Sequence, residues 1–235
     1  MAKASKIALL SACMALLLSA ALPAQAQETV SIGWSHVVVL RPKAPRASVI
    51  LMPGGDGSIG AGDNGAITRL VNNQLVRTRN AYLARGLAVM VVDAGTNLST
   101  AVEYMAAIKR PVTVIATSRG TLRAASGIAG GARPDALVLS SAYLTAESGS
   151  SENVASILGS PAALPRTLVI EHRHDGCRFT QPTGVDPFIR WAGGKARAVW
   201  LDGGRNEDPN PCEALAYHGF YGLDGQVVSL GAAWR

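Results

Sequence analysis

The chain has 235 residues, with 22 lysines and arginines against 16 aspartates and glutamates, so its formal net charge is +6. No basic run is interleaved with aromatic residues, and so mild an excess of positive charge argues against a nucleic-acid-binding protein. The length is sufficient for one domain with a substantial core.

The N-terminal segment has the pattern of a secretory signal peptide. An apolar run over residues 7–22 follows two lysines and ends at the small-residue triplet Ala24-Gln25-Ala26, which is typical of such leaders. The run is too short to span a membrane, and no second one follows. We therefore expect cleavage after Ala26 and export to the periplasm or the medium. The alternative is a lipoprotein cleavage box that places a lipid on Cys13; we favour the first because the apolar run continues well past Cys13.

Apolar runs of strand length then alternate with segments of helical character. The first segment, 29–40, can form one or two antiparallel strands. Strands are predicted at 48–52, 87–92, 112–116, 136–139, 167–170 and 198–201, and helices at 66–85, 100–109, 119–128, 153–158 and 187–192. Strands that are apolar on both faces, each followed by a helix, belong to a mostly parallel sheet covered on both sides. We therefore predict a single doubly wound α/β domain over residues 27–235, after a signal peptide over residues 1–26.

The first long strand leads into a glycine-rich stretch, PGGDGSIGAGDNG. Gly55, Gly57 and Gly60 match the dinucleotide-binding pattern G-x-G-x-x-G, and the next strand ends in Asp93, where such a domain places its ribose-binding acid. Against this, the third glycine of the pattern belongs inside a helix that presents its N-terminus to the pyrophosphate. Further glycines here postpone the helix, so we expect no nucleotide cofactor and keep an oxidoreductase as an alternative.

The strand at 112–116 leads into Ala116-Thr117-Ser118-Arg119-Gly120. This small-x-Ser-x-small pattern is that of a nucleophile elbow, with alanine where glycine commonly stands first. At a sharp turn from strand to helix the flanking residues must be small, because strand and helix approach closely. The alternative for Ser118 is an ordinary helix N-cap, which also suits such a junction.

An acid and a histidine follow later strands in the chain order that a serine triad on such a sheet requires. Asp175 follows the strand at 167–170, and His218 comes after the last predicted strand. Because the carboxyl ends of parallel strands meet at one edge, we expect both near Ser118. Asp202 is the alternative acid, and a loop histidine with no catalytic role is the alternative for His218.

With these residues in place, the chain resembles the α/β-hydrolase family over nearly all of residues 27–235. The matching segments are LMPGGDG, RNAYLARGLAVMVVDAG, VIATSRGT, VIEHRHDGC and YHGFYG. Two departures are Ala116 at the elbow and Pro53 in place of the histidine often found before the glycines. Neither departure removes a catalytic group.

The resemblance implies a role for each site residue. Ser118 would be the nucleophile, His218 the general base and then acid, and Asp175 the residue that orients the imidazole. The oxyanion hole would use the backbone N–H of Arg119 together with that of Gly55 or Asp56. No metal or organic cofactor is implied.

Cys177 and Cys212 are the cysteines that remain after cleavage, and in an oxidising compartment they most simply form one disulfide. This bond would connect the loop carrying Asp175 to the loop carrying His218. Two free or catalytic thiols are the alternative.

The segment at 145–165 is too short for a cap domain, so we expect an open site that accepts small esters or the surface of a polymeric ester. We therefore predict an exported, metal-free serine hydrolase, a carboxylesterase that does not bind nucleic acid. A peptidase, amidase or thioesterase with the same triad, or a non-catalytic binding protein, are the alternatives. The oligomeric state is not predicted.

Overall fold

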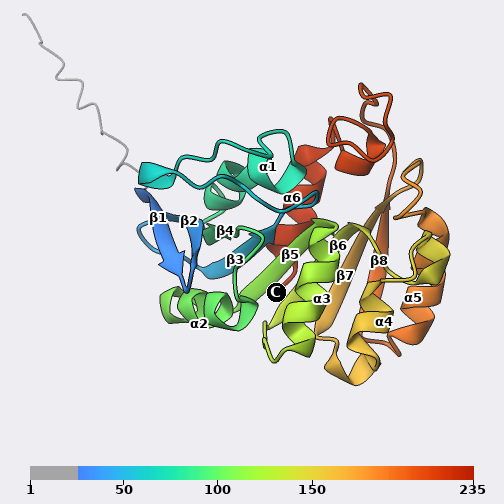
Figure 1. Cartoon of the computed structure of the whole chain (residues 1–235), viewed down its shortest axis with the longest axis horizontal. Helices are drawn as coiled ribbons and strands as arrows, with labels where there is room; N and C mark the ends of the chain where they lie inside the picture. Colours follow the sequence, from blue (N-terminus) through green and yellow to red (C-terminus); the bar gives the residue numbers. More distant parts are fainter. Residues whose placement is uncertain (1–25) are drawn as a thin grey trace, which may run out of the picture.

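A computed structural model of the chain describes residues 26–235 (Figure 1). The predicted signal peptide therefore lies outside the described residues, apart from Ala26, which begins the first strand. A single eight-stranded sheet runs through the domain in the order β1-β2-β4-β3-β5-β6-β7-β8. The strands are β1 (Ala26–Ile32), β2 (Ser35–Arg41), β3 (Ala47–Met52), β4 (Leu87–Val91), β5 (Val112–Ser118), β6 (Ala136–Ala142), β7 (Arg166–His172) and β8 (Ala196–Leu201).

The sheet is parallel except at one edge. All neighbours from β4 through β8 in the spatial order run parallel, whereas β1 and β2 form an antiparallel ribbon that joins the sheet through β4. The central strands β3, β4 and β6 are buried at every position. Their unbroken apolar runs follow from this, because a strand covered on both faces has no solvent-facing side.

Helices cover both faces of the sheet, as Figure 1 shows. One apolar cluster contains residues of α1 and α6, and a second contains residues of α2, α3, α4 and α5. The prediction of a doubly wound α/β sheet is therefore confirmed. The helices are α1 (Gln74–Leu83), α2 (Leu98–Ile108), α3 (Gly120–Ala129), α4 (Val154–Leu158), α5 (Val185–Trp191) and α6 (Asp224–Ala233), and short 3-10 turns cover Asp63–Gly65, Ala146–Ser148, Pro161–Ala163, Pro182–Gly184 and Tyr217–Gly219.

Two helices differ from the prediction. The helix expected over 66–85 begins only at Gln74, where the Asn73 side chain accepts a hydrogen bond from the Leu75 N–H and so caps the first turn. Helix α6 was not predicted, because its sequence DGQVVSLGAA contains two glycines and two valines, which are weak helix formers. Burial of Val227, Val228 and Ala232 in the cluster shared with α1 stabilises it instead.

No helix among residues 26–235 is long and apolar enough to cross a membrane.

Candidate active site

Ser118 is the last residue of the central strand β5 and stands at a sharp turn into α3. Its φ angle of 53° lies in the left-handed region, which is strained for a residue with a side chain. A Cβ atom on Gly120 would lie 2.6 Å from the carbonyl oxygen of Pro53 and closer still to that of Met52, and a Cβ on Gly54 would lie 2.9 Å from the Cβ of Ser118. Only glycine fits at positions 54 and 120. The small residue that the elbow pattern places two positions after the serine is therefore a steric requirement.

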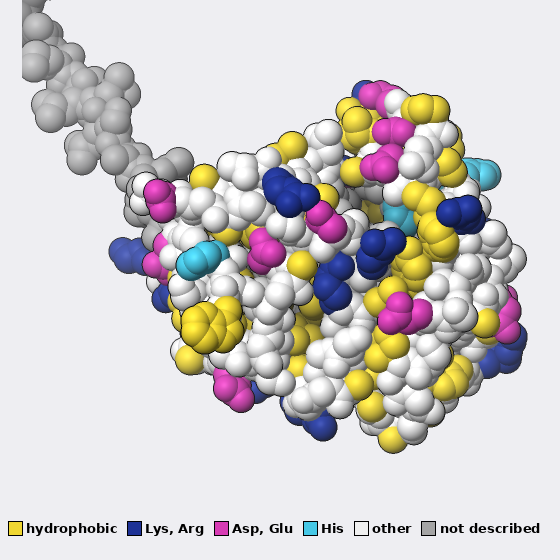
Figure 2. Space-filling view, viewed as in Figure 1, with side chains coloured by type: hydrophobic (Ala, Val, Ile, Leu, Met, Phe, Trp, Pro, Cys, Tyr) yellow, Lys and Arg dark blue, Asp and Glu magenta, His cyan; other side chains and the backbone are white. Residues whose placement is uncertain are grey.

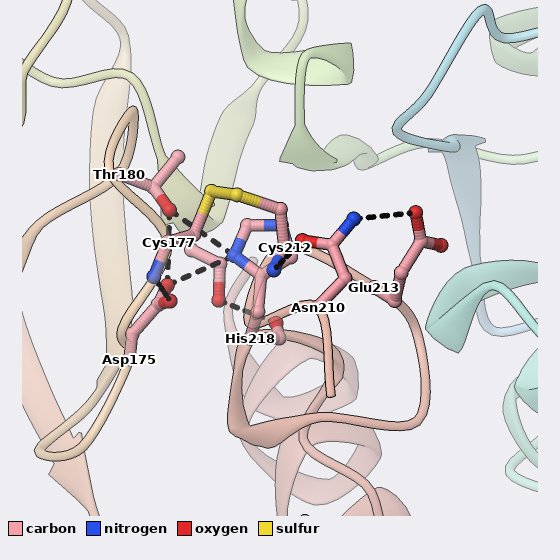
Figure 3. Close-up of a disulfide and its surroundings, with 8 residues drawn as sticks. Asp175, Cys177, Thr180, Asn210, Cys212, Glu213 and His218 are labelled. Carbon is pink, nitrogen blue, oxygen red and sulfur yellow. Dashed lines mark hydrogen bonds and ion pairs between the residues drawn. A yellow bond between two sulfur atoms is a disulfide. The ribbon is translucent and has the colours of Figure 1, made fainter. Parts of the chain in front are cut away.

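His218 and Asp175 lie in hydrogen-bonding contact although 43 residues separate them (Figure 3). His218 Nδ1 is 2.9 Å from Asp175 Oδ2, and both side chains are buried. An ionised carboxylate can only accept, so this contact requires Nδ1 to carry the hydrogen and leaves Nε2 as the free basic nitrogen. This is the tautomer that a general base for a serine hydroxyl needs.

The Asp175 carboxylate is fixed by two further donors. The Cys177 N–H donates to Oδ1 at 2.9 Å, and the Thr180 hydroxyl donates to Oδ2 at 3.0 Å (Figure 3). Thr180 Oγ1 also lies 3.1 Å from His218 Nδ1, so it can accept a share of the same N–H. Thr180 is fully buried and was missed by the sequence analysis, because a lone threonine in a loop carries no recognisable signal.

Ser141 connects the histidine to the central sheet. Its buried hydroxyl donates to the His218 carbonyl oxygen at 2.7 Å, and its own φ is 41°. Thr121 makes a similar connection at the elbow, where its hydroxyl donates to the Ser118 carbonyl at 2.6 Å and accepts from the Tyr143 N–H at 3.3 Å. The end of β6 is thus tied both to the loop that carries His218 and to the elbow after β5.

Three backbone N–H groups beside the serine have no acceptor among the described residues. They belong to Gly55, Asp56 and Arg119. All three residues are exposed, so water can satisfy these N–H groups until a ligand oxygen replaces it. The three residues named from the sequence for an oxyanion hole therefore have donors available.

Ser118 and His218 line one cleft of about 480 Å³. The same cleft is lined by Gly55, Asp56 and Arg119. The Ser118 hydroxyl makes no hydrogen bond to His218 among the described contacts, and such contacts in enzymes often tighten only when substrate binds. Helix α4 lies in the segment 145–165, where a cap domain would be inserted. It packs against α3 in the helical layer.

Cys177 and Cys212 form the predicted disulfide, and both line this cleft (Figure 3). The bond joins two loops that are 35 residues apart in sequence. Because the Cys177 N–H also donates to Asp175, the disulfide is coupled directly to the carboxylate.

The other acids named from the sequence lie elsewhere. Asp202 is exposed, and its Oδ1 is 3.4 Å from His174 Nε2. The Asp93 carboxylate accepts hydrogen bonds from the N–H groups of Ile59 and Ala94 and thereby braces the glycine-rich loop. With α1 starting only at Gln74, this loop does not present a helix N-terminus in the way the dinucleotide pattern requires.

Glu171 is a second buried acid that the sequence analysis did not single out. It lies near the end of β7, where its Oε1 accepts from the His172 N–H at 3.1 Å and its Oε2 has no hydrogen-bond partner within residues 26–235. Burial raises the pKa of Glu171 well above its usual range, and the nearby Asp175 raises it further. Glu171 therefore keeps its proton to a higher pH than an exposed glutamate does.

A mostly parallel sheet whose central strand turns sharply into a helix at a strained serine defines the α/β-hydrolase fold, and the chain has this fold. No protein-family model and no curated protein matches the sequence.

Solved structures are similar at low sequence identity. An esterase domain of a Rhodothermus marinus protein has 12% identity and a TM-score of 0.58, over 85% of this chain and 92% of that one. A dienelactone hydrolase from Anabaena variabilis has 15% identity and a TM-score of 0.51, over 89% and 95% of the two chains. A puromycin-hydrolyzing peptidase of Mycobacterium tuberculosis has 12% identity and a TM-score of 0.57, over 91% of this chain but 41% of the peptidase. Such identities establish the fold alone.

Proposed function

We propose that the chain is an exported serine hydrolase that cleaves carboxylic esters through an acyl-enzyme. One observation carries the proposal: the strained Ser118 shares a cleft with a histidine whose Nδ1 is bound to a buried carboxylate. A helix N-cap serine needs none of these surroundings. The esterases and the dienelactone hydrolase among the structural neighbours support the choice of an ester substrate.

In the acylation step, the Ser118 hydroxyl attacks the ester carbonyl carbon while His218 Nε2 accepts its proton. Asp175, bound to the opposite ring nitrogen at 2.9 Å, stabilises the resulting imidazolium. The carbonyl oxygen becomes negatively charged and accepts hydrogen bonds from the N–H groups of Arg119 and of Gly55 or Asp56. The imidazolium then gives its proton to the departing alkoxide, which leaves as the alcohol.

In the deacylation step, water attacks the acyl-enzyme while His218 accepts a proton from it. The second tetrahedral intermediate forms in the same oxyanion hole. Its collapse breaks the bond to Ser118 Oγ, which regains the proton from His218 and releases the carboxylic acid.

The disulfide supports the export part of the proposal, because such bonds persist in oxidising compartments.

The proposal is tested with one acyl group carried on three linkages. Acetate esters, thioesters and anilides of matched leaving groups are offered to the parent protein and to Ser118→Ala. We expect the ester to be hydrolysed fastest, and we expect Ser118→Ala to lose roughly 10⁴-fold or more in kcat while its thermal melting stays unchanged. Faster cleavage of the anilide would favour the amidase alternative. Turnover that survives in Ser118→Ala, or is absent on all three linkages, would contradict the proposal.

A further inference from the structure

Arg123 lies on the first turns of α3, directly after the elbow, and binds the backbone of the glycine-rich loop. Its guanidinium donates to three successive carbonyl oxygens: to Gly55 at 3.3 Å, to Gly54 at 3.4 Å, and to Pro53. All hydrogen bonds of this guanidinium within the described residues go to these carbonyls. One side chain therefore contacts consecutive peptide planes beside the nucleophile, and the Gly57 N–H, which donates to the Gly54 carbonyl at 3.1 Å, helps to fix one of them.

In a trans peptide the C=O and the following N–H point in opposite directions. Since Arg123 holds the carbonyls of Gly54 and Gly55, the N–H groups of Gly55 and Asp56 must face away from it. Both residues line the cleft that contains Ser118, and neither N–H has an acceptor among the described residues. We infer that Arg123 is a positioning residue that keeps the oxyanion hole preformed, an inference that rests on the proposed hydrolase function.

An arginine suits this role better than a lysine, because its planar fork carries several donors that can satisfy separate carbonyls at once. Burial lowers the pKa of Arg123, and the positive charge of Arg119 lowers it further. Gly57 leaves room for the side chain, since a Cβ there would lie 2.6 Å from the guanidinium carbon. The Arg123 guanidinium is thus partly buried, although burial and the positive charge of Arg119 both disfavour its charged form.

The test compares Arg123→Met and Arg123→Lys with the control Arg133→Met. Arg133 also donates to two backbone carbonyls, those of Ile128 at 3.2 Å and Ala132 at 2.9 Å, but at the far end of α3. On a short neutral ester we expect Arg123→Met to lower kcat about tenfold to a hundredfold with little change in KM, because a misplaced oxyanion donor affects the transition state alone. Affinity for an alkylboronic acid should fall by a similar factor, and Arg123→Lys should recover part of both losses.

Unchanged kcat and boronate affinity in a folded Arg123→Met would overturn the inference. So would an equal loss in Arg133→Met, or an effect on KM alone. Should Arg123→Met fail to fold, the kcat and boronate affinity of Arg123→Lys decide the matter. The parent protein separates this inference from the proposed function: esterase activity that depends on Ser118 but not on Arg123 contradicts only the role of Arg123.

A different observation concerns the surface beside the nucleophile. The cleft adjoins a second hollow, and Arg119, Tyr143 and Phe179 line both. The two aromatic rings are stacked, with centroids 6.0 Å apart. Figure 2 shows Lys and Arg side chains and an apolar patch around a hollow in which a histidine is visible. The cleft that contains Ser118 is therefore lined by aromatic rings next to the Arg119 side chain.

Within the part of the chain that the structure describes, the side chains of Arg119 and Arg178 have no acidic partner. The Arg119 side chain is exposed and makes no hydrogen bond or ion pair among the described residues, and Arg178, whose guanidinium lies 4.6 Å from the centroid of the Phe179 ring, makes none either. The nearby Asp56 is already paired with Arg69 at 2.6 Å. Two more acids line the hollows, Glu152 in the second and Glu213 in the cleft, but neither forms an ion pair with Arg119.

This geometry points to esters whose acyl group ends in a carboxylate, the half-esters of dicarboxylic acids. The apolar chain of the acyl group would lie on the Tyr143–Phe179 surface, and its carboxylate would bind the Arg119 guanidinium. This inference also depends on the proposed function. It names a substrate class for the same site.

The test compares monomethyl adipate with methyl 6-methylheptanoate, in which an isopropyl group replaces the carboxylate. We expect kcat/KM to be about tenfold higher for the anionic ester, and this preference should shrink at high salt. Arg119→Gln should abolish the preference, so that kcat/KM becomes equal for the two esters, and Arg119→Lys should keep part of the preference. The ratio cancels the backbone contribution of this residue, because both esters use the same oxyanion hole. A preference for the neutral ester, or a ratio unaffected by Arg119→Gln, would refute the inference while leaving the esterase proposal intact.

Discussion

The candidate nucleophile and the candidate acid–base pair are held in place by different means. Ser118 belongs to the central strand, and close contacts with the backbone at Gly54 and Gly120 fix its turn. His218 lies on a long loop between β8 and α6, and Asp175 lies on the loop after β7. Hydrogen bonds and one disulfide bring these two loops together.

This difference predicts different stabilities for the two halves of the site. The elbow shares the stability of the sheet, since β5 is buried between β3 and β6. Loops open locally at lower free energy than buried strands do. Perturbing the loops should therefore lower activity while the fold persists, whereas the elbow should fail only together with the sheet.

The largest effect is expected from the loop carboxylate. Asp175→Asn should lower kcat by roughly 10⁴-fold, because an amide that donates to the imidazole favours the wrong tautomer. Thermal melting should change far less. The matched control is Asp202→Asn, which removes the exposed acid beside His174. Steady-state kinetics on a neutral ester measure both; equal losses in the two variants would contradict the assignment of Asp175.

Breaking the disulfide should have the next largest effect. Shifting a catalytic group by about an angstrom can cost on the order of a hundredfold in rate, so the Cys177→Ser/Cys212→Ser variant should lose activity on that scale at 25 °C. The bond closes a loop of 35 residues, and its removal should lower stability by about 3–4 kcal/mol. Far-ultraviolet circular dichroism should stay nearly unchanged at that temperature. Full activity without the bond would show that the loops hold the site unaided.

Thr180→Val tests a single hydrogen bond within the same loops. The variant removes the hydroxyl that donates to Asp175 at 3.0 Å and preserves the shape of the side chain. We expect kcat/KM to fall about tenfold and stability to fall by about 1–2 kcal/mol. Thr183→Val, which removes an exposed hydroxyl bonded to the Glu147 carbonyl, is the control. Kinetics indistinguishable from the parent would mean that the hydroxyl does not orient the carboxylate.

For Glu171 we expect a pH-dependent effect on stability, smaller than the effects of the preceding variants. Its pKa is raised by burial and then by Asp175, so the folded protein keeps a proton that the unfolded chain loses above its ordinary pKa of 4.5. Stability therefore falls with rising pH on account of this group. Glu171→Gln does not titrate, so its stability relative to the parent should increase as pH rises from 4 to 8. Denaturant titrations across this range would contradict the account if the difference stayed constant.

The contrast between a serine on a buried strand and an acid–histidine pair on loops also explains what could be predicted from the sequence. The strands and the elbow depend on local patterns, namely unbroken apolar runs and small residues around Ser118, so the sequence alone indicated them. The disulfide was predicted from the two cysteines that lie outside the predicted signal peptide. The chain order pointed to Asp175 and His218, which the structure places side by side; their catalytic roles stay predictions.

Long-range packing hid the rest. Hydrogen-bonding contacts join Thr180, Ser141 and Arg123 to residues that lie 38 to 77 positions away in the sequence. Nothing in the neighbouring sequence indicates these partners. Helix α6 likewise depends on packing against α1 rather than on its own residues. Contacts of this kind become visible only once the sheet has brought distant segments together.

The most direct test of the account is covalent labelling with a fluorophosphonate, followed by peptide mass spectrometry of the oxidised and the reduced protein. An activated serine is phosphonylated when a general base removes its proton and an oxyanion hole receives the phosphoryl oxygen. We predict one adduct per chain, on Ser118, forming rapidly in the oxidised protein and more slowly after reduction of the disulfide. No adduct, or an adduct on a serine other than Ser118, would contradict the central claim. Labelling equally fast in both states would contradict the proposed dependence of the base on its loops.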